Sequence, residues 1–166
     1  MNRSSGILLP ISSLPSPYGI GTFGAAAYAF ADFLHEAGQK YWQLLPLGPT
    51  SYGDSPYQSF STFAGNPYFV DLDLLIEDGL LLAEEAEACD WGEDPRHVDY
   101  GKIYESRFAI LAKAKARGYA RDYEDVQAFC QENEQWLDNY ALYMACKKHF
   151  GMKELFDDLG SEDWKE

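Results

Sequence analysis

One segment of the sequence gathers most of the side chains that could do chemistry. Residues 51–72 read SYGDSPYQSFSTFAGNPYFVDL and follow a short apolar run. Tyr52 and Tyr57 offer flat aromatic faces, which suit the C–H side of a pyranose ring. Hydroxyl and amide groups that could bind sugar hydroxyls come from Ser55, Gln58, Ser59 and Asn66. The segment has the chemistry of a carbohydrate-binding loop, but the same residue types also build rigid structural loops, so composition alone leaves both interpretations open.

Other familiar catalytic patterns are missing from the sequence. No P-loop, HExxH or GxSxG motif occurs, which excludes the common nucleotide, zinc-hydrolase and serine-nucleophile sites. The cysteines lack metal-ligand spacing, and we interpret the dispersed histidines as surface or packing residues. These residues are Cys89, Cys130 and Cys146, and His35, His97 and His149. We therefore expect no metal and no cofactor, and we expect Asp54, Asp71 and Asp73 to serve in turns or caps.

Charge and composition limit the partners. The sequence holds 13 Lys and Arg against 27 Asp and Glu, a formal net charge of −14, which repels nucleic-acid phosphates and anionic lipid head groups. The acidic balance suits a neutral, polyhydroxylated substrate, although solubility alone explains it equally well. An odd number of cysteines fits a reduced, cytoplasmic protein, and no stretch approaches 18 apolar residues. We expect neither nucleic acid nor membrane as a partner.

The loop must be positioned by the elements before it. Gly6 to Leu9 is a short apolar run, typical of a parallel strand that is covered on both faces. Apolar residues at helical spacing then follow Thr22, which could cap the helix, and Gly38 stands where the helix should end. Tyr41 to Leu45 is a second apolar run, ended by Pro46. The pattern predicts a β-α-β unit with parallel strands, with an irregular loop over residues 10–21.

The second half of the sequence has a different pattern. Residues 68–75 could be an extended piece that runs into a turn, and the acid-rich segment of residues 77–99 reads as a solvated face or loop. Two helical stripes follow, and they predict two or three helices. The first stripe is Tyr104, Phe108, Leu111 and Ala112, and the second is Val126, Phe129, Cys130, Leu137, Tyr140 and Met144.

Several motifs, in order, carry a resemblance to a known family. They are GILLP (6–10), SLPSPYGIG (13–21), YWQLLPLGPT (41–50), the segment 51–72, VDYGKIY (98–104) and DNYALYMACKKHFG (138–151). Together they span essentially the whole chain, and it resembles the 4-α-glucanotransferases of glycoside hydrolase family 77, also called amylomaltases or disproportionating enzymes. The resemblance implies the α/β class: the N-terminal part of a (β/α)8 TIM barrel, namely strand one, helix one and strand two, with an inserted and mainly helical subdomain.

The resemblance also implies a division of the chain and a reaction. Residues 1–76 would begin the catalytic barrel and carry the substrate loop 46–67, and residues 77–166 would be the inserted subdomain, truncated here. The family transfers a segment of an α-1,4-glucan to the 4-hydroxyl of an acceptor by a retaining double displacement, which requires a carboxylate nucleophile and a carboxylic acid. We expect no catalytic residue in this chain. The nucleophile Asp, the acid/base Glu and a stabilising Asp would lie beyond Glu166, so the fragment alone would be inactive.

Site residues carry over position by position. Tyr57 matches the tyrosine that stacks on sugar at the cleavage subsite, and Ser55 matches a serine that lines the same cleft. Tyr52 and Tyr100 match aromatic residues of a second, outer glucan site. Two further residues of the signature are Gln58 and Asn66. The implied ligands are α-1,4-glucans and maltooligosaccharides.

Two alternatives remain open from the residues. A non-catalytic glucan-binding polypeptide would explain the missing acid and nucleophile pair. An α-amylase-like hydrolase would share the fold and the mechanism, and it would pass the glycosyl unit to water instead of to a sugar.

Overall fold

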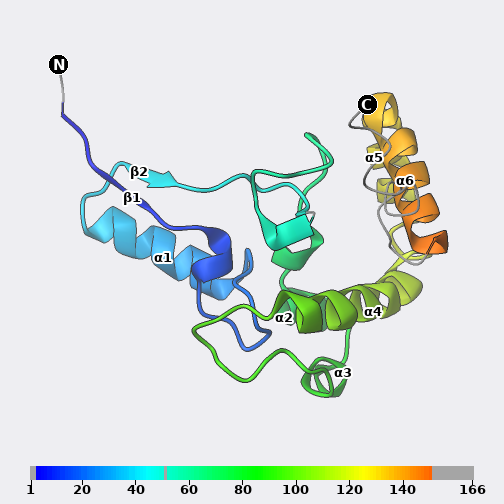
Figure 1. Ribbon diagram of the computed structural model, residues 1–166, viewed down its shortest axis with the longest axis horizontal. Helices are drawn as coiled ribbons and strands as arrows, with labels where there is room; N and C mark the ends of the chain where they lie inside the picture. The colour runs from blue at the N-terminus through cyan, green and yellow to red at the C-terminus, as the bar shows by residue number, and fades with distance from the viewer. Residues whose placement is uncertain (1–2, 51, 151–166) are drawn as a thin grey trace, which may run out of the picture. The chain divides into compact units, whose positions relative to one another are not determined.

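The computed structural model describes residues 3–50 and 52–150, apart from the side chain of Tyr52 (Figure 1). Contacts group the chain into two compact units, which are residues 1–122 and 123–166. The expected domain boundary between residues 76 and 77 lies inside the first unit, and it stays a prediction.

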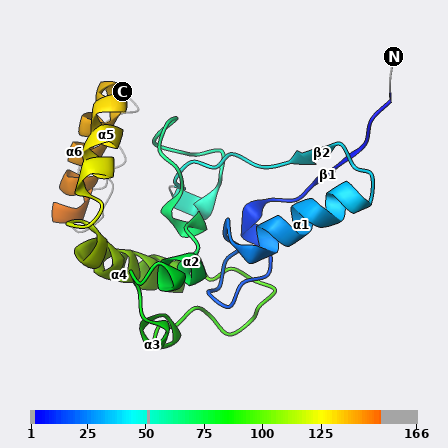
Figure 2. The ribbon, with the colours of Figure 1, turned by 180° about the vertical axis from the view of Figure 1, so that it is seen from behind.

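The first unit begins with the predicted β-α-β unit. Strands β1 (Gly6–Leu8) and β2 (Tyr41–Gln43) pair in parallel, with Gly6 opposite Tyr41. Helix α1 (Ala25–Glu36) connects them and lies along the pair in both ribbon views (Figures 1 and 2). A side chain at position 6 would collide with the Tyr41 carbonyl, so the close approach of the strands requires glycine there. The prediction of parallel strands is confirmed.

The start of α1 differs from the prediction. The helix begins after Gly24, which offers no side-chain cap, and Thr22 instead donates its hydroxyl hydrogen to Asp71 Oδ2. The Asp71 carboxylate lies so close to Gly24 that any side chain there would meet it. A carboxylate at a helix N-terminus is favourable because of the helix dipole. Thr22 therefore makes a hydrogen bond to a residue far along the chain and does not cap α1. The predicted end is confirmed, since Gly38 follows the helix with φ 70°.

Residues 66–77 fold into two short helical pieces instead of the predicted extended segment. A 3-10 helix (Pro67–Phe69) starts at Asn66, whose side chain accepts from the Tyr68 N–H. Helix α2 (Leu72–Glu77) starts at Asp71, whose side chain accepts from the Leu74 N–H. The two caps turn the chain at each start. The expected cap role of Asp71 is confirmed.

Helices α3 (Ala83–Glu87) and α4 (Tyr100–Gly118) complete the first unit. Asp99 caps α4 by accepting from the Lys102 N–H at 3.1 Å. The fully buried stripe of α4 lies one position earlier than the predicted one, and Ala112 is exposed. The buried residues of α4 are Ile103, Arg107, Ile110, Ala114 and Gly118. The acidic segment 77–99 thus contains α3, and exposed ion pairs join it to α4, such as Asp90 to Lys102 at 2.9 Å.

The loop between β1 and α1 belongs to the core. Its residues Ile11 and Ile20 are 1% and 3% exposed, and residues Ile11–Ser13 form a 3-10 helix where no regular structure was predicted. Tyr18 packs with Leu72 and Ile110. The loop therefore joins the β-α-β unit to α2 and α4.

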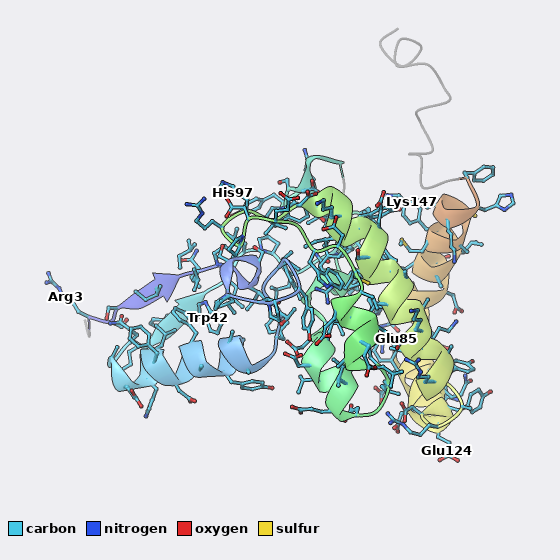
Figure 3. All side chains as sticks on the ribbon, turned by 90° about the horizontal axis from the view of Figure 1, so that it is seen from below. Arg3, Trp42, Glu85, His97, Glu124 and Lys147 are labelled. Atoms are coloured by element: carbon cyan, nitrogen blue, oxygen red, sulfur yellow. The ribbon has the colours of Figure 1, made fainter. Side chains whose placement is uncertain are left out.

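The strands, by contrast, are open. Ile7, Leu8 and Tyr41 are 41%, 54% and 65% exposed. Among the described residues α1 provides the cover, where the ring centres of Phe30 and Trp42 lie 4.9 Å apart. Figure 3 shows Trp42 beside α1. The sequence pattern of strands covered on both faces is thus only half met in this structure.

The second unit is a pair of helices, α5 (Tyr123–Glu132) and α6 (Glu134–His149), as the second predicted stripe indicated. Neither helix has a fully buried residue, and Phe129 of the predicted stripe is 51% exposed. Trp136 donates its indole N–H to Asn133 Oδ1 at 3.0 Å, which fixes the turn between the helices. In the described part of the chain, no helix has the length and apolar character needed to cross a membrane.

Candidate functional site

A cavity of about 200 Å³ opens at the carboxyl ends of β1 and β2. Binding sites of parallel α/β folds lie at this end of the strands. Its walls come from three places: the chain after β1, the chain after β2, and the start of α4. The lining residues are Pro10, Ile11, Ser12, Ile20, Leu45, Pro46, Leu47, Thr50, Asp54, Pro56, Asn66, Phe69 and Tyr100.

The base of loop 46–67 is held by Asn66, which is 7% exposed. Its backbone N–H donates to the Leu47 carbonyl at 2.8 Å, which closes the loop, and its Oδ1 accepts from the Tyr68 N–H at 3.0 Å. Both contacts are to backbone. Asn66 lines the cavity, and its hydrogen bonds show that it also builds the loop.

The tip of the loop carries Tyr57. Ser55 Oγ accepts from the Tyr57 N–H at 3.3 Å, and the Ser55 carbonyl accepts from the Gln58 N–H at 3.1 Å. These bonds form a tight turn that presents the Tyr57 ring with 72% of its surface exposed. The three predicted residues therefore lie together on one turn, outside the lining of the cavity. Tyr52 starts a 3-10 helix (Tyr52–Asp54), and its side chain lies outside the described residues.

Tyr100 is the predicted residue that joins the wall from far along the sequence. Its ring lies 6.3 Å from that of Tyr68. Burial, and then the charge of Asp54, raise the pKa of the Tyr100 hydroxyl, and burial raises the pKa of the Asp54 carboxyl. Tyr100 and Asp54 thus line the same cavity, where both side chains are partly shielded from water.

Asp54 is a residue whose position in the site the sequence did not predict. It occupies a turn, as expected, with φ 54° after Gly53 at 77°, a left-handed conformation that Asp tolerates better than most residues. It also lines a second cavity, of about 690 Å³, with residues 93–94 and 97–102. The SYGD sequence is a turn signal, but only the fold brings it to Tyr100.

The lining shows what the described residues could do. Retaining glycoside chemistry requires two carboxyl groups about 5 to 5.5 Å apart, and Asp54 is the one carboxylic residue among those that line the smaller cavity. Within the described ranges, no three His, Cys, Asp or Glu side chains come together as metal ligands. The cavity and the exposed tyrosine can bind and orient a sugar.

The segment GIGTFG, residues 19–24, has the glycine spacing of a dinucleotide fingerprint, but the chain itself fills the space beside these glycines. Side chains at Gly19 and Gly21 would collide with the backbone of Trp91 and Ile11. At Gly24 the Asp71 carboxylate stands where a pyrophosphate would bind at the helix N-terminus. These glycines serve internal packing.

Comparison with known proteins gives consistent matches. The model of the glycoside hydrolase 77 family, described as 4-alpha-glucanotransferase, matches residues 9–165. A 4-alpha-glucanotransferase of Streptococcus pneumoniae serotype 4 is 53% identical over 163 residues, which are 98% of this chain and 31% of that protein. A 4-alpha-glucanotransferase of Clostridium butyricum is 54% identical over 140 residues, 84% of this chain and 29% of that protein.

A solved structure agrees with the sequence matches. The amylomaltase from Streptococcus agalactiae, in complex with acarbose, superposes with a TM-score of 0.87 at 46% identity, over 94% of this chain and 32% of that one. The chain thus spans about a third of the length of the relatives that it matches.

Proposed function

Because this chain belongs to glycoside hydrolase family 77, the 4-alpha-glucanotransferases, we propose that the complete enzyme transfers a segment of an α-1,4-glucan to the 4-hydroxyl of an acceptor glucan or glucose. The β-α-β unit is part of a (β/α)8 barrel. The observation that carries the proposal is the family match over residues 9–165, which includes the whole loop at the carboxyl ends of β1 and β2. The substrates are α-1,4-glucans and maltooligosaccharides.

The chain's own residues would bind the glucan. The exposed ring of Tyr57 forms a stacking platform for the sugar at the cleavage subsite, and the turn that starts at Ser55 holds this ring in place. Tyr100, with Tyr52, forms the outer glucan site. Gln58, which is exposed beside Tyr57, adds a hydrogen-bonding amide, and Asn66 acts mainly as the anchor of the loop.

The reaction would need carboxylates from elsewhere in the barrel. A nucleophile Asp, an acid/base Glu and a stabilising Asp would come from strands outside residues 1–166, and the glycosyl unit would pass through a covalent intermediate. Asp54 is not a substitute, since the reaction requires a pair of carboxyl groups and Asp54 is the one carboxylic residue that lines the smaller cavity. The acarbose complex of the similar amylomaltase supports a carbohydrate cleft.

A cytoplasmic location is part of the proposal. Cys89, Cys130 and Cys146 are free and partly buried, which supports a reducing compartment. The net charge of −14 disfavours nucleic acid and anionic membranes as partners.

The test separates transfer from hydrolysis. The complete enzyme is incubated with maltotriose, and the products and the number of reducing ends are followed over time. Transfer gives glucose together with longer maltooligosaccharides and leaves the number of reducing ends constant. Hydrolysis raises that number with each turnover and would contradict the proposal. A fall of about ten- to a hundredfold in product formation in a Tyr57→Ala variant, with a smaller fall in Tyr57→Phe, would tie the activity to this chain's site.

A further inference from the structure

Arg107 is a buried charge that the proposed reaction does not use. Its side chain, on α4, is fully buried. Nη1 donates to the Val70 carbonyl at 3.1 Å, whereas Nε and Nη2 find no hydrogen-bond partner among the described residues. The guanidinium lies 5.2 Å from the ring centre of Trp91, and burial lowers its pKa to about 10. A buried, half-satisfied charge is costly, so a methionine of similar length would fill the same space at lower cost.

The hydrogen bond from Arg107 to Val70 reaches the segment that anchors loop 46–67. Val70 ends the 3-10 helix Pro67–Phe69, which directly follows loop 46–67. The middle residue of that helix is Tyr68, whose ring lies 6.3 Å from that of Tyr100 and 6.1 Å from that of Phe108. Arg107 therefore holds α4 on the short segment that anchors the loop.

Helix geometry connects Arg107 to the cavity wall. It follows Tyr100 by about two helical turns, so both side chains project from the same face of α4. A shift or rotation of α4 along the segment 67–70 would move the Tyr100 ring with it. Tyr100 and Asp54 line both cavities, so the placement of α4 sets the shape of the wall.

We propose that Arg107 is a positioning residue: by holding the Val70 carbonyl it fixes α4 against the end of loop 46–67, and so it sets Tyr100 opposite Asp54. Trp91 covers the guanidinium and holds the segment before α4 to the same charge. This inference rests on the proposed function, because it takes Tyr100 as a glucan contact.

The experiment is a double-mutant cycle in the complete enzyme. Arg107→Met keeps the bulk and removes the donor, Tyr100→Ala removes the aromatic wall, and the double variant joins the two changes. Arg107→Lys keeps a donor that can reach toward Val70. Arg117→Met is the matched control, because Arg117 also lies on α4 and also donates through Nη1 to a carbonyl, that of Leu80, at 3.1 Å. Steady-state kinetics on amylose and the thermal midpoint are measured for each variant.

We expect Arg107→Met to raise the KM for amylose about tenfold, within the range of coupled residues, with a smaller effect on kcat. In the Tyr100→Ala background the same change should add little, because the wall that Arg107 positions is already gone. Arg107→Lys should restore part of the wild-type KM, and Arg117→Met should leave KM unchanged whatever its effect on the thermal midpoint.

Three results would overturn the inference. The first is a wild-type KM in Arg107→Met together with a lower thermal midpoint, which is what a purely structural residue would give. The second is full additivity of the double variant. If Arg107→Met does not fold, Arg107→Lys carries the test, and the third result is a KM effect of this variant that persists unchanged without Tyr100. Failure of the proposed function is distinct: the wild-type enzyme would lack transferase activity, or Tyr100→Ala would leave the KM for amylose unchanged.

Discussion

The first unit contains two regions that differ in how much of their apolar surface is buried and in how their backbone turns are capped. Around α2 and α4 the core residues Leu72, Ala86 and Ile103 are fully buried, and side chains such as Asn66 and Asp71 cap the chain turns there. In the strand pair Leu8 and Tyr41 are more than half exposed. The wall of the site is therefore held by contacts within the first unit, such as that of Arg107 with Val70, whereas the strand pair beneath it leaves apolar side chains open.

The largest effect should come from separating residues 1–166 from the rest of the enzyme. Two strands with open edges and an apolar face favour association between chains. We expect this isolated segment to aggregate or to lack a cooperative thermal transition, as measured by calorimetry and size-exclusion chromatography. A sharp transition of a monomeric segment would show that the sheet needs no further cover. The segment should also form no products from maltotriose, because we expect the catalytic carboxylate pair to come from other strands of the barrel.

The next test compares two leucines of the helical region in the complete enzyme. Leu72→Ala empties a fully buried position, so it should lower the free energy of unfolding by about 2 to 5 kcal/mol. Leu82→Ala, at a position that is 53% exposed, should cost less than about 1 kcal/mol. Denaturant unfolding measures both variants. Equal losses would mean that the core around α2 is not the stabilising region.

Loop 46–67 has the same difference in burial, between Asn66 at its buried base and Tyr57 at its exposed tip. Tyr57→Ala removes an aromatic platform whose loss costs about 1 to 3 kcal/mol by analogy with stacked bases, or about ten- to a hundredfold in kcat/KM if the contact favours the transition state. Tyr57→Phe should cost less because the ring face survives. The readout is steady-state kinetics of the complete enzyme on maltotriose and on amylose.

The control for this test is Tyr52→Ala at the proposed outer site. It should change the handling of amylose and the product size more than it changes the turnover of maltotriose. If instead Tyr57→Ala retained the wild-type kcat/KM on maltotriose and Tyr52→Ala lost it, the inner and outer assignments would be reversed.

The smallest effect concerns a hydrogen bond that joins the two regions. Tyr18, in the loop after β1, donates to Asp73 Oδ1 of α2 at 2.5 Å. Burial and this carboxylate raise the pKa of Tyr18 from 10.0 to about 12. The folded state thus holds the phenol proton more tightly than the unfolded state does. The resulting stability is present below pH 10 and is lost as the pH rises toward 12.

Tyr18→Phe should therefore lower stability at neutral pH by about 1 kcal/mol and should flatten the decline between pH 10 and 12. Tyr28→Phe is the matched control, because Tyr28 is 68% exposed on α1. Chemical unfolding of the complete enzyme across this pH range checks both. An alkaline decline that stays equally steep in Tyr18→Phe would assign it to other groups.

Local signals in the sequence predicted the elements that carry them. The apolar runs and Gly38 were enough to predict the β-α-β unit. The spacing of apolar residues and the glycine that ends a helix in a left-handed conformation are both properties of neighbouring residues. Residues 66–77 were misread because their caps, Asn66 and Asp71, are polar residues whose cap and turn uses look alike in sequence. The buried face of α4 lies one residue earlier than the apolar pattern predicts, because that face includes the charged Arg107, and only its contacts with Val70 and Trp91 make that position internal.

Motifs and spacing were enough to predict the family, the parallel strands and the aromatic and amide residues of loop 46–67, because these signals lie in neighbouring residues and need no knowledge of distant contacts. The positions of those residues in space depend on how the chain packs. This packing turns Asn66 inward to the backbone, leaves Tyr57 exposed, and brings Tyr100 to Asp54 across 46 positions of the sequence. Packing also pairs the Thr22 hydroxyl with the Asp71 carboxylate and buries the charge of Arg107. Such pairings depend on which surfaces meet when the chain packs, and no local pattern specifies them.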